Sequence, residues 1–172
     1  MVIKWTNLHK VLTEYTEYFI KEAQKNIDDY DAVATGNMRN ILPNEIKIGD
    51  DYFSITVKIE DYFKYVEGGS KGLISSPPNA VYPAHFPPVQ AIKEWIEVKG
   101  LSTGNERDDL SFAYAISTNI EKRGLEPKPF FKDAKESTYK AFEEKIVQAI
   151  KDDVALAIED NIMPLFERIM RG

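Results

Sequence analysis

Glu67 and His85 are the two side chains in this sequence with the most obvious chemistry. A carboxylate and an imidazole can share general acid–base catalysis, so a small cytoplasmic hydrolase could use both in one cleft. The proline-rich segment at residues 73–88 would form the roof of that cleft. However, Glu67 has no second carboxylate at a defined spacing, and a hydrogen bond received at the end of a sheet is the better explanation of this residue. We therefore expect no enzyme and keep the hydrolase as an alternative.

Metal and phosphate sites have little support either. The chain has no cysteine and two histidines, His9 and His85, so a zinc site would need both histidines plus carboxylates from distant segments. We predict no metal site and no cofactor. The run Gly-Gly-Ser-Lys-Gly at residues 68–72 resembles a phosphate-binding loop only superficially, because its lysine precedes a glycine and no helix follows. A flexible turn is the better interpretation of this run.

Composition and charge limit the class of protein. The 172 residues include 28 acidic and 22 basic side chains, which give a formal net charge of −6, and 43% of them are hydrophobic. This composition fits a single folded domain over residues 1–172. The negative charge argues against a broad phosphate-gripping surface, although DNA could pass close by without specific binding. No apolar run approaches the roughly 20 residues that span a bilayer, and no secretory signal is recognisable, so we expect no membrane partner.

Hydrophobic spacing predicts an α+β fold, in which a small antiparallel sheet packs against a long N-terminal helix and a long C-terminal helix. Apolar residues at three- and four-residue steps predict the first helix over residues 7–29, capped by Asn7, and the last over residues 133–160. Strict alternation over residues 45–60 predicts a hairpin with one buried face. Shorter helices are expected at residues 62–68, 89–99 and 106–123. The residues of the last one expected to face the core are Leu110, Ala113, Tyr114, Ile116 and Ile120.

The break between the helices predicted at residues 106–123 and 133–160 follows from backbone restrictions and suggests no catalytic role. Gly124 permits a left-handed helix cap, and the Pro-Lys-Pro run that ends at Pro129 holds the linker extended. Phe130 and Phe131 follow directly, and we predict that they anchor the next helix in the core. Further along, Pro164 is expected to kink or end that helix.

Several short motifs occur in an order that resembles a known family. Thr-Gly-Asn-Met-Arg at residues 35–39 follows the first long helix, and the segment from Tyr62 to Gly69, which ends in Val-Glu-Gly-Gly, forms a short helix. Trp-Ile at residues 95–96 lies on another helix. The pattern Ala-x-x-Ile-x-x-Asn-Ile-x-x-x-Gly at residues 113–124 then leads to Pro-Phe-Phe-x-x-Ala at residues 129–134. This order is similar to that of tailed-bacteriophage neck and tail-completion proteins, which include head-to-tail connector and minor tail components.

The resemblance implies a structural protein. Members of this family form rings at the head–tail junction and help join the tail to the DNA-filled capsid. The expected partners are therefore other copies of this chain and the neighbouring neck, portal-side and tail proteins. The expected locations are the virion, at the head–tail junction or in the tail, and the host cytoplasm during assembly. A peptide-binding adaptor that seats a partner along the edge of the hairpin also stays open as an alternative.

Two segments contribute little to the predicted core of the monomer, and they are our candidates for subunit contacts. One is the loop at residues 73–88, which is too rich in proline for a central strand or helix. The other is a contact tail at residues 161–172. Neither belongs to the family pattern. The residues predicted to make these contacts are Pro77, Pro78, Tyr82, His85, Phe86, Leu165 and Phe166.

Overall fold

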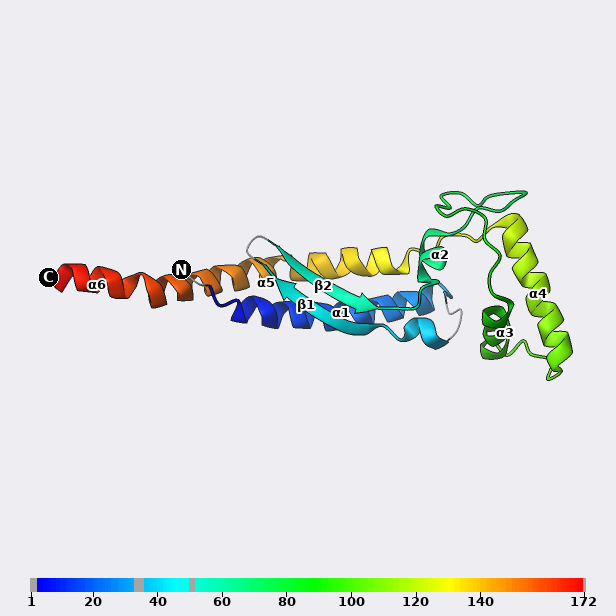
Figure 1. The fold of residues 1–172 in the computed structure, drawn as a ribbon, viewed down its shortest axis with the longest axis horizontal. Coiled ribbons are helices and arrows are strands. Elements are labelled where there is room, and N and C mark those ends of the chain that lie inside the picture. Colours follow the sequence, from blue (N-terminus) through cyan, green and yellow to red (C-terminus); the bar gives the residue numbers. More distant parts are fainter. Residues whose placement is uncertain (1–2, 33–35, 50–51, 172) are drawn as a thin grey trace.

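The computed structural model describes residues 3–32, 36–49 and 52–171. In chain order its elements are α1 (Thr6–Asp29), the 3-10 turn η1 (Gly36–Arg39), β1 (Leu42–Ile48), β2 (Phe53–Lys58), α2 (Phe63–Gly68), α3 (Val89–Val98), α4 (Glu106–Arg123), α5 (Phe130–Asn161) and α6 (Met163–Arg171). The fold is α+β, as predicted. Figure 1 shows an elongated molecule in which α1, α5 and the sheet form a body, while α3 and α4 stand at one end and α6 projects from the other.

The core of the body lies between α1 and α5, which are antiparallel and side by side (Figure 1). The buried positions of α1 recur at three- and four-residue steps, as the sequence predicted. Each fully buried large apolar side chain contributes about 1.5–3 kcal/mol to stability. One buried cluster consists of Phe19, Ala23, Ile27, Ala32, Met38, Ile41, Phe130 and Ala134, and the other of Leu8, Leu12, Phe142, Ile146 and Ala149.

The hairpin covers these two helices with one face. β1 and β2 pair antiparallel with Ile46 opposite Ile55, and both side chains pack against the second cluster, while Val57 packs against the first. The predicted one-sided burial is therefore confirmed. β1 begins at Leu42, earlier than predicted, and includes Pro43. A proline is tolerated there because both strands are edge strands and the register shifts beside it.

The start of α1 is capped by a side chain from the far end of the chain, and the prediction that Asn7 caps it is wrong. The Asp153 carboxylate on α5 accepts the backbone N–H groups of Asn7 and Leu8 at 3.0 and 2.9 Å, and the Asn7 amide donates to it at 2.9 Å. Asp153 is 1% exposed. A helix start leaves four N–H groups without intrahelical partners, and this contact satisfies two of them.

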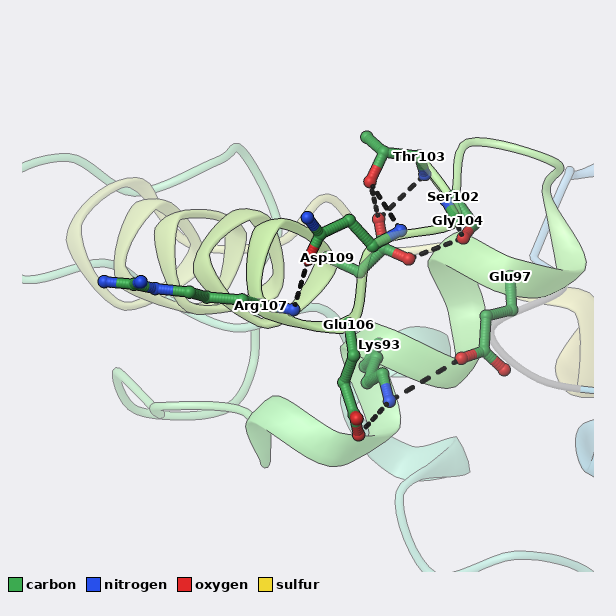
Figure 2. Close-up of polar contacts among 9 residues, drawn as sticks. Lys93, Glu97, Ser102, Thr103, Gly104, Glu106, Arg107 and Asp109 are labelled. Atoms are coloured by element: carbon green, nitrogen blue, oxygen red, sulfur yellow. Dashed lines mark hydrogen bonds and ion pairs between the residues drawn. The ribbon is translucent and has the colours of Figure 1, made fainter.

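α3 and α4 form a helical hairpin whose connection is held by short-range polar contacts (Figure 2). Asn105 caps α4 by accepting the N–H of Arg107 at 3.0 Å. The Asp109 carboxylate accepts the Ser102 hydroxyl, together with the backbone N–H and the hydroxyl of Thr103 at 2.8 and 2.9 Å. These contacts join residues that lie within seven positions of each other.

α4 buries only part of the face that the sequence predicted: Ala113 is buried, and Ile116 and Ile120 are half-buried. Leu110 and Tyr114 are 48% and 60% exposed, whereas Ala113 and Ser117 are buried. Within the described part of the chain, the main partner of α4 is α3, which has ten residues and buries Ile96 alone. A helix that packs against one short neighbour covers a narrow stripe, so small side chains occupy that stripe and the larger ones remain in solvent.

Three backbone segments cross where the body meets the α3–α4 hairpin. Ser70 and Leu125 exchange two hydrogen bonds at 2.9 and 2.8 Å, and Ser70 also lies opposite Tyr82 in a parallel bridge. Gly69 and Gly124 have φ angles of 65° and 83° with ψ angles of 164° and −177°, a region that glycine alone adopts readily. The predicted left-handed cap at Gly124 is therefore wrong in detail. The backbone must extend there because Leu125 pairs at once with Ser70.

α5 begins at Phe130, earlier than the predicted residue 133. Phe130 is fully buried, and the ring of Phe131 packs edge-on against Phe19 with 4.8 Å between ring centroids. The prediction that these phenylalanines anchor the helix is confirmed. Pro164 lies in the first turn of α6, where a proline is tolerated, and α5 ends just before it as expected.

Candidate interaction surfaces

Glu67 is a helix cap. Its two carboxylate oxygens accept the backbone N–H groups of Phe131 and Lys132, at the start of α5, at 2.8 and 2.9 Å. Burial raises the pKa of Glu67 above its ordinary value of 4.5, although these two N–H donors act in the opposite direction. Glu67 thus receives hydrogen bonds, as the sequence suggested, but at the start of a helix rather than at the end of the sheet. The contact fixes α2 against α5.

The structure places His85 apart from the groove that contains Glu67. A groove of about 720 Å³ lies between the proline-rich loop and the start of α5, with Glu67, Pro78 and Lys132 among its lining residues. His85 does not line it. The imidazole instead stacks on the Tyr65 ring at a centroid distance of 4.6 Å. The groove contains Glu67, the carboxylate of the hydrolase hypothesis. His85, the imidazole of that hypothesis, contacts Tyr65 instead.

Ser70 lies in a run that also fits Gly-x-Ser-x-Gly, the spacing that in α/β-hydrolases presents a nucleophilic serine on a strand-to-helix turn. In this fold Ser70 is 2% exposed. It belongs to the backbone crossing with Leu125 and Tyr82, and a long loop follows it in place of a helix. Gly69 and Gly72 of this run allow another backbone to approach closely, because a Cβ there would lie 2.6 Å from the Leu125 carbonyl oxygen and 2.4 Å from the Lys122 carbonyl oxygen.

Within residues 3–32, 36–49 and 52–171, no three histidine, aspartate or glutamate side chains are grouped so that they could hold a metal ion. No helix in the described part of the chain is long and apolar enough to cross a membrane.

The predicted contact residues of the loop pack largely within the chain itself. The backbone oxygen of Tyr82 accepts the Lys71 N–H at 2.8 Å, and the Tyr82 ring packs edge-on against Tyr65 at 5.2 Å. The Phe86 ring lies 5.7 Å from that of Tyr114 on α4. Together with His85, these aromatic residues hold the loop against the body and the α3–α4 hairpin.

Other residues of the loop reach into solvent. Pro77 is partly buried beside Gly124, and Pro78 is exposed at the edge of the 720 Å³ groove. The most exposed apolar side chains of the loop are Leu73, Ile74 and Val81, at 69%, 77% and 68%. The sequence reasoning missed these three. Leu73 and Ile74 lie between a glycine and a serine, and none of the three belongs to a periodic apolar pattern that would bury it.

α6 is the clearest unpartnered element. Its apolar side chains recur at three- and four-residue steps on one face, yet α6 buries no residue. Leu165 and Phe166, both predicted to make contacts, are 54% and 60% exposed, and Ile169 and Met170 are 74% and 84% exposed. Figure 1 shows that α6 continues the direction of α5 beyond the end of α1, so the body does not cover this face.

A second apolar surface lies on α5 beside the tip of the hairpin. An open groove of about 540 Å³ is present there. Phe53, Tyr139 and Val147 supply its apolar lining and are 43%, 55% and 51% exposed. Its polar lining includes Glu143, Glu144, Gln148 and Lys151. The sequence did not reveal this groove, because Phe53 is brought to α5 only by the packing of the hairpin.

The hypothesis of a peptide-binding adaptor requires a strand edge that can pair with a peptide. β1 and β2 are the two strands of the described sheet, so each has an outer edge open to a peptide. β1, however, contains Pro43 and a Glu45–Lys47 ion pair at 3.0 Å. Prolines and charges are the usual means by which edge strands avoid pairing with other chains.

Comparison with known proteins found no family model, no curated protein and no solved structure that matches this chain.

Proposed function

We propose that this chain is a structural subunit of the head–tail junction of a tailed bacteriophage, where copies of it form a ring that helps join the tail to the DNA-filled capsid. The observation that carries the proposal is α6, a helix whose apolar face is not covered by any described part of its own chain. Such a face on a projecting helix marks an interaction site. The motif order at residues 35–39, 65–69 and 113–134 connects that site with the neck and tail-completion proteins.

The shape and charge of the chain support the same function. The molecule is elongated (Figure 1), and exposed apolar side chains occur both on α6 and in the 540 Å³ groove on α5. A ring subunit must contact neighbours through two different surfaces. A net charge of −6 suits a ring near packaged DNA, because the chain would not hold passing phosphates through broad electrostatics. Neighbouring neck, portal-side and tail proteins are the further partners.

The test is the presence and the effect of the chain in phage particles. In an infection by the phage that encodes it, we expect mass spectrometry to detect the chain in purified virions. Deletion of its gene should leave DNA-filled heads and separate tails, counted by electron microscopy. Removal of α6 alone should give the same result. Normal virions that lack the chain would refute the proposal.

A second variant separates this function from the hydrolase alternative. The double change Glu67→Gln and His85→Ala removes both groups proposed for catalysis and leaves α6 intact. We expect head–tail joining to continue with this variant, provided that it melts close to the wild-type temperature. A folded double variant that no longer joins heads and tails would favour the alternative.

A further inference from the structure

We infer that α6 of one copy docks in the 540 Å³ groove between α5 and the hairpin of the next copy, so that the chain associates head to tail. This inference rests on the proposed function, because it assigns the contact that would build the ring. The apolar residues of α6 would lie against Phe53, Tyr139 and Val147, the exposed apolar lining of the groove. One surface is a ridge and the other is concave, so the two have complementary shapes.

The docked helix must come from another copy. α5 is a continuous helix through Asn161, and α6 continues its direction (Figure 1). At 1.5 Å per residue, Phe166 lies roughly 28 Å along the helix from Val147 in the same chain. α6 therefore cannot fold back into its own groove. A contact between two different surfaces is heterologous, the kind that generates rings or filaments rather than a closed dimer.

The charges of the two surfaces are complementary. The groove is rimmed by two acidic side chains, Glu143 and Glu144, and one basic side chain, Lys151. α6 has the opposite balance, with Arg168 and Arg171 against one acidic residue, Glu167. The one ion pair of α6 in the described structure, between Glu167 and Arg171 at 3.9 Å, is exposed and contributes little. Both arginines are therefore available to the acidic rim of a neighbour.

The small size of α6 limits the affinity that we expect for its contact with the groove. A stable interface buries about 800 Å² per partner, and a nine-residue helix supplies only part of that area. Isolated pairs should therefore form only at high protein concentration. Each copy in a ring uses both its α6 and its groove. Closure of the ring would therefore stabilise the contacts, because no single contact can dissociate without the others holding that copy in place.

Disulfide trapping tests the contact in the full-length chain. The chain has no cysteine, so Val147→Cys and Ile169→Cys each introduce a single thiol, at positions 51% and 74% exposed. When the two variants are mixed and oxidised mildly, we expect several-fold more mixed disulfide than either homodimer. A chain with both cysteines should form a ladder beyond dimers. Leu73→Cys, at a 69% exposed loop position, is the matched control and should crosslink with neither.

Three outcomes would overturn the inference. Ile169→Cys homodimers as abundant as the mixed disulfide would mean that two α6 helices pair with each other. Mixed disulfide no more abundant than with Leu73→Cys would mean random collision. Unchanged trapping after Glu143→Lys and Glu144→Lys would contradict the placement of the arginines. If the charges pair as inferred, the two glutamate-to-lysine changes in the groove should weaken the trapping. Arg168→Glu and Arg171→Glu on the chain that supplies α6 should then restore it.

The failure of this inference and that of the proposed function are distinguishable. If trapping fails but virions contain the chain and need it for joining, the α6–groove contact is wrong and the structural function stands. If trapping succeeds but the chain is absent from particles, the contact stands and the head–tail function is wrong.

Discussion

In the body of the molecule, helix ends are capped by side chains from distant segments, whereas the α3–α4 hairpin is held by contacts between near neighbours. Asp153 caps α1 across 146 positions of sequence, and Glu67 caps α5 across 64. Asp109 reaches its partners within seven positions. The body can therefore form only when both ends of the chain are present, while the α3–α4 connection can form locally.

The two regions also differ in how much apolar surface they bury. The body contains both buried clusters, whereas the described interior of the α3–α4 hairpin consists mainly of Ile96, Ala113 and Ser117. Phe112 and Tyr114 of α4 stay 44% and 60% exposed. We infer that global stability resides in the body, and that the α3–α4 hairpin can open without unfolding it.

Loss of a core side chain of the body should have the largest effect. Phe130→Ala removes a fully buried ring between α1 and α5 and should lower the free energy of unfolding by about 3–5 kcal/mol. Tyr114→Ala on the α3–α4 hairpin removes a 60% exposed ring that contacts Phe86, and it should cost only about 0.5–1.5 kcal/mol. Urea denaturation followed by circular dichroism measures both. Equal losses would show that the two regions are stabilised alike.

Removal of the remote cap of α1 should have the next largest effect. Asp153→Ala leaves the N–H groups of Asn7 and Leu8 without their carboxylate, which should cost about 1.5–3 kcal/mol. Asp152→Ala removes an adjacent carboxylate whose described contact is with Gln148, and it should cost far less. The same urea denaturation compares the two variants. An Asp153→Ala protein no less stable than the control would contradict the role of the long-range cap.

Glu67 should have a smaller and pH-dependent effect. Glu67→Ala should cost about 1 kcal/mol through the lost cap of α5. Burial raises the pKa of Glu67 above 4.5, so protonation favours the folded state. The resulting stabilisation is present below pH 4.5 and is lost as the pH rises through the folded pKa. Wild type should therefore gain stability relative to Glu67→Gln on acidification. A difference independent of pH would contradict this.

Asp109 should have the smallest effect on global unfolding. Asp109→Asn weakens the α3–α4 connection, so amide hydrogen exchange should accelerate in α3 and α4 and stay unchanged in α1. The Ser102 hydroxyl and the Thr103 N–H lower the pKa of Asp109 below its ordinary value of 3.8. Its stabilisation is therefore present above pH 3.8 and is lost as the pH falls through the folded pKa. Equal acceleration in α1 would mean that the two regions unfold together.

Much of the fold could be predicted from the sequence, because local periodicity dictates helices and strands. The apolar spacing of α1, the alternation of the hairpin and the break before Phe130 all appear in the structure. Predictions about which side chains face solvent were less successful. Tyr114 has helical spacing toward a core, but no second layer covers it, and periodicity does not report how many neighbours a helix has.

Of the candidate interaction surfaces, one could be recognised from the sequence and the other could not. The tail at Leu165 and Phe166 could be recognised from the sequence, because apolar residues follow Pro164, which was expected to kink or end the long helix. The groove on α5 could not, because Phe53 reaches it only through hairpin packing. Aromatic residues of the proline-rich loop, such as Tyr82, are held by contacts within the chain that the sequence does not encode locally.

By itself, the sequence determined the elements: two long helices, a one-sided hairpin, a helix break at the Pro-Lys-Pro run and an apolar tail. These follow from hydrophobic period and from backbone restrictions, which act over a few residues. The tertiary structure alone decided which carboxylates cap which helices, where three backbones cross between Gly69 and Gly124, and which apolar faces remain uncovered. The physical reason is that hydrogen bonds and burial depend on proximity in space, and Asp153 meets Asn7 only after α1 and α5 have packed.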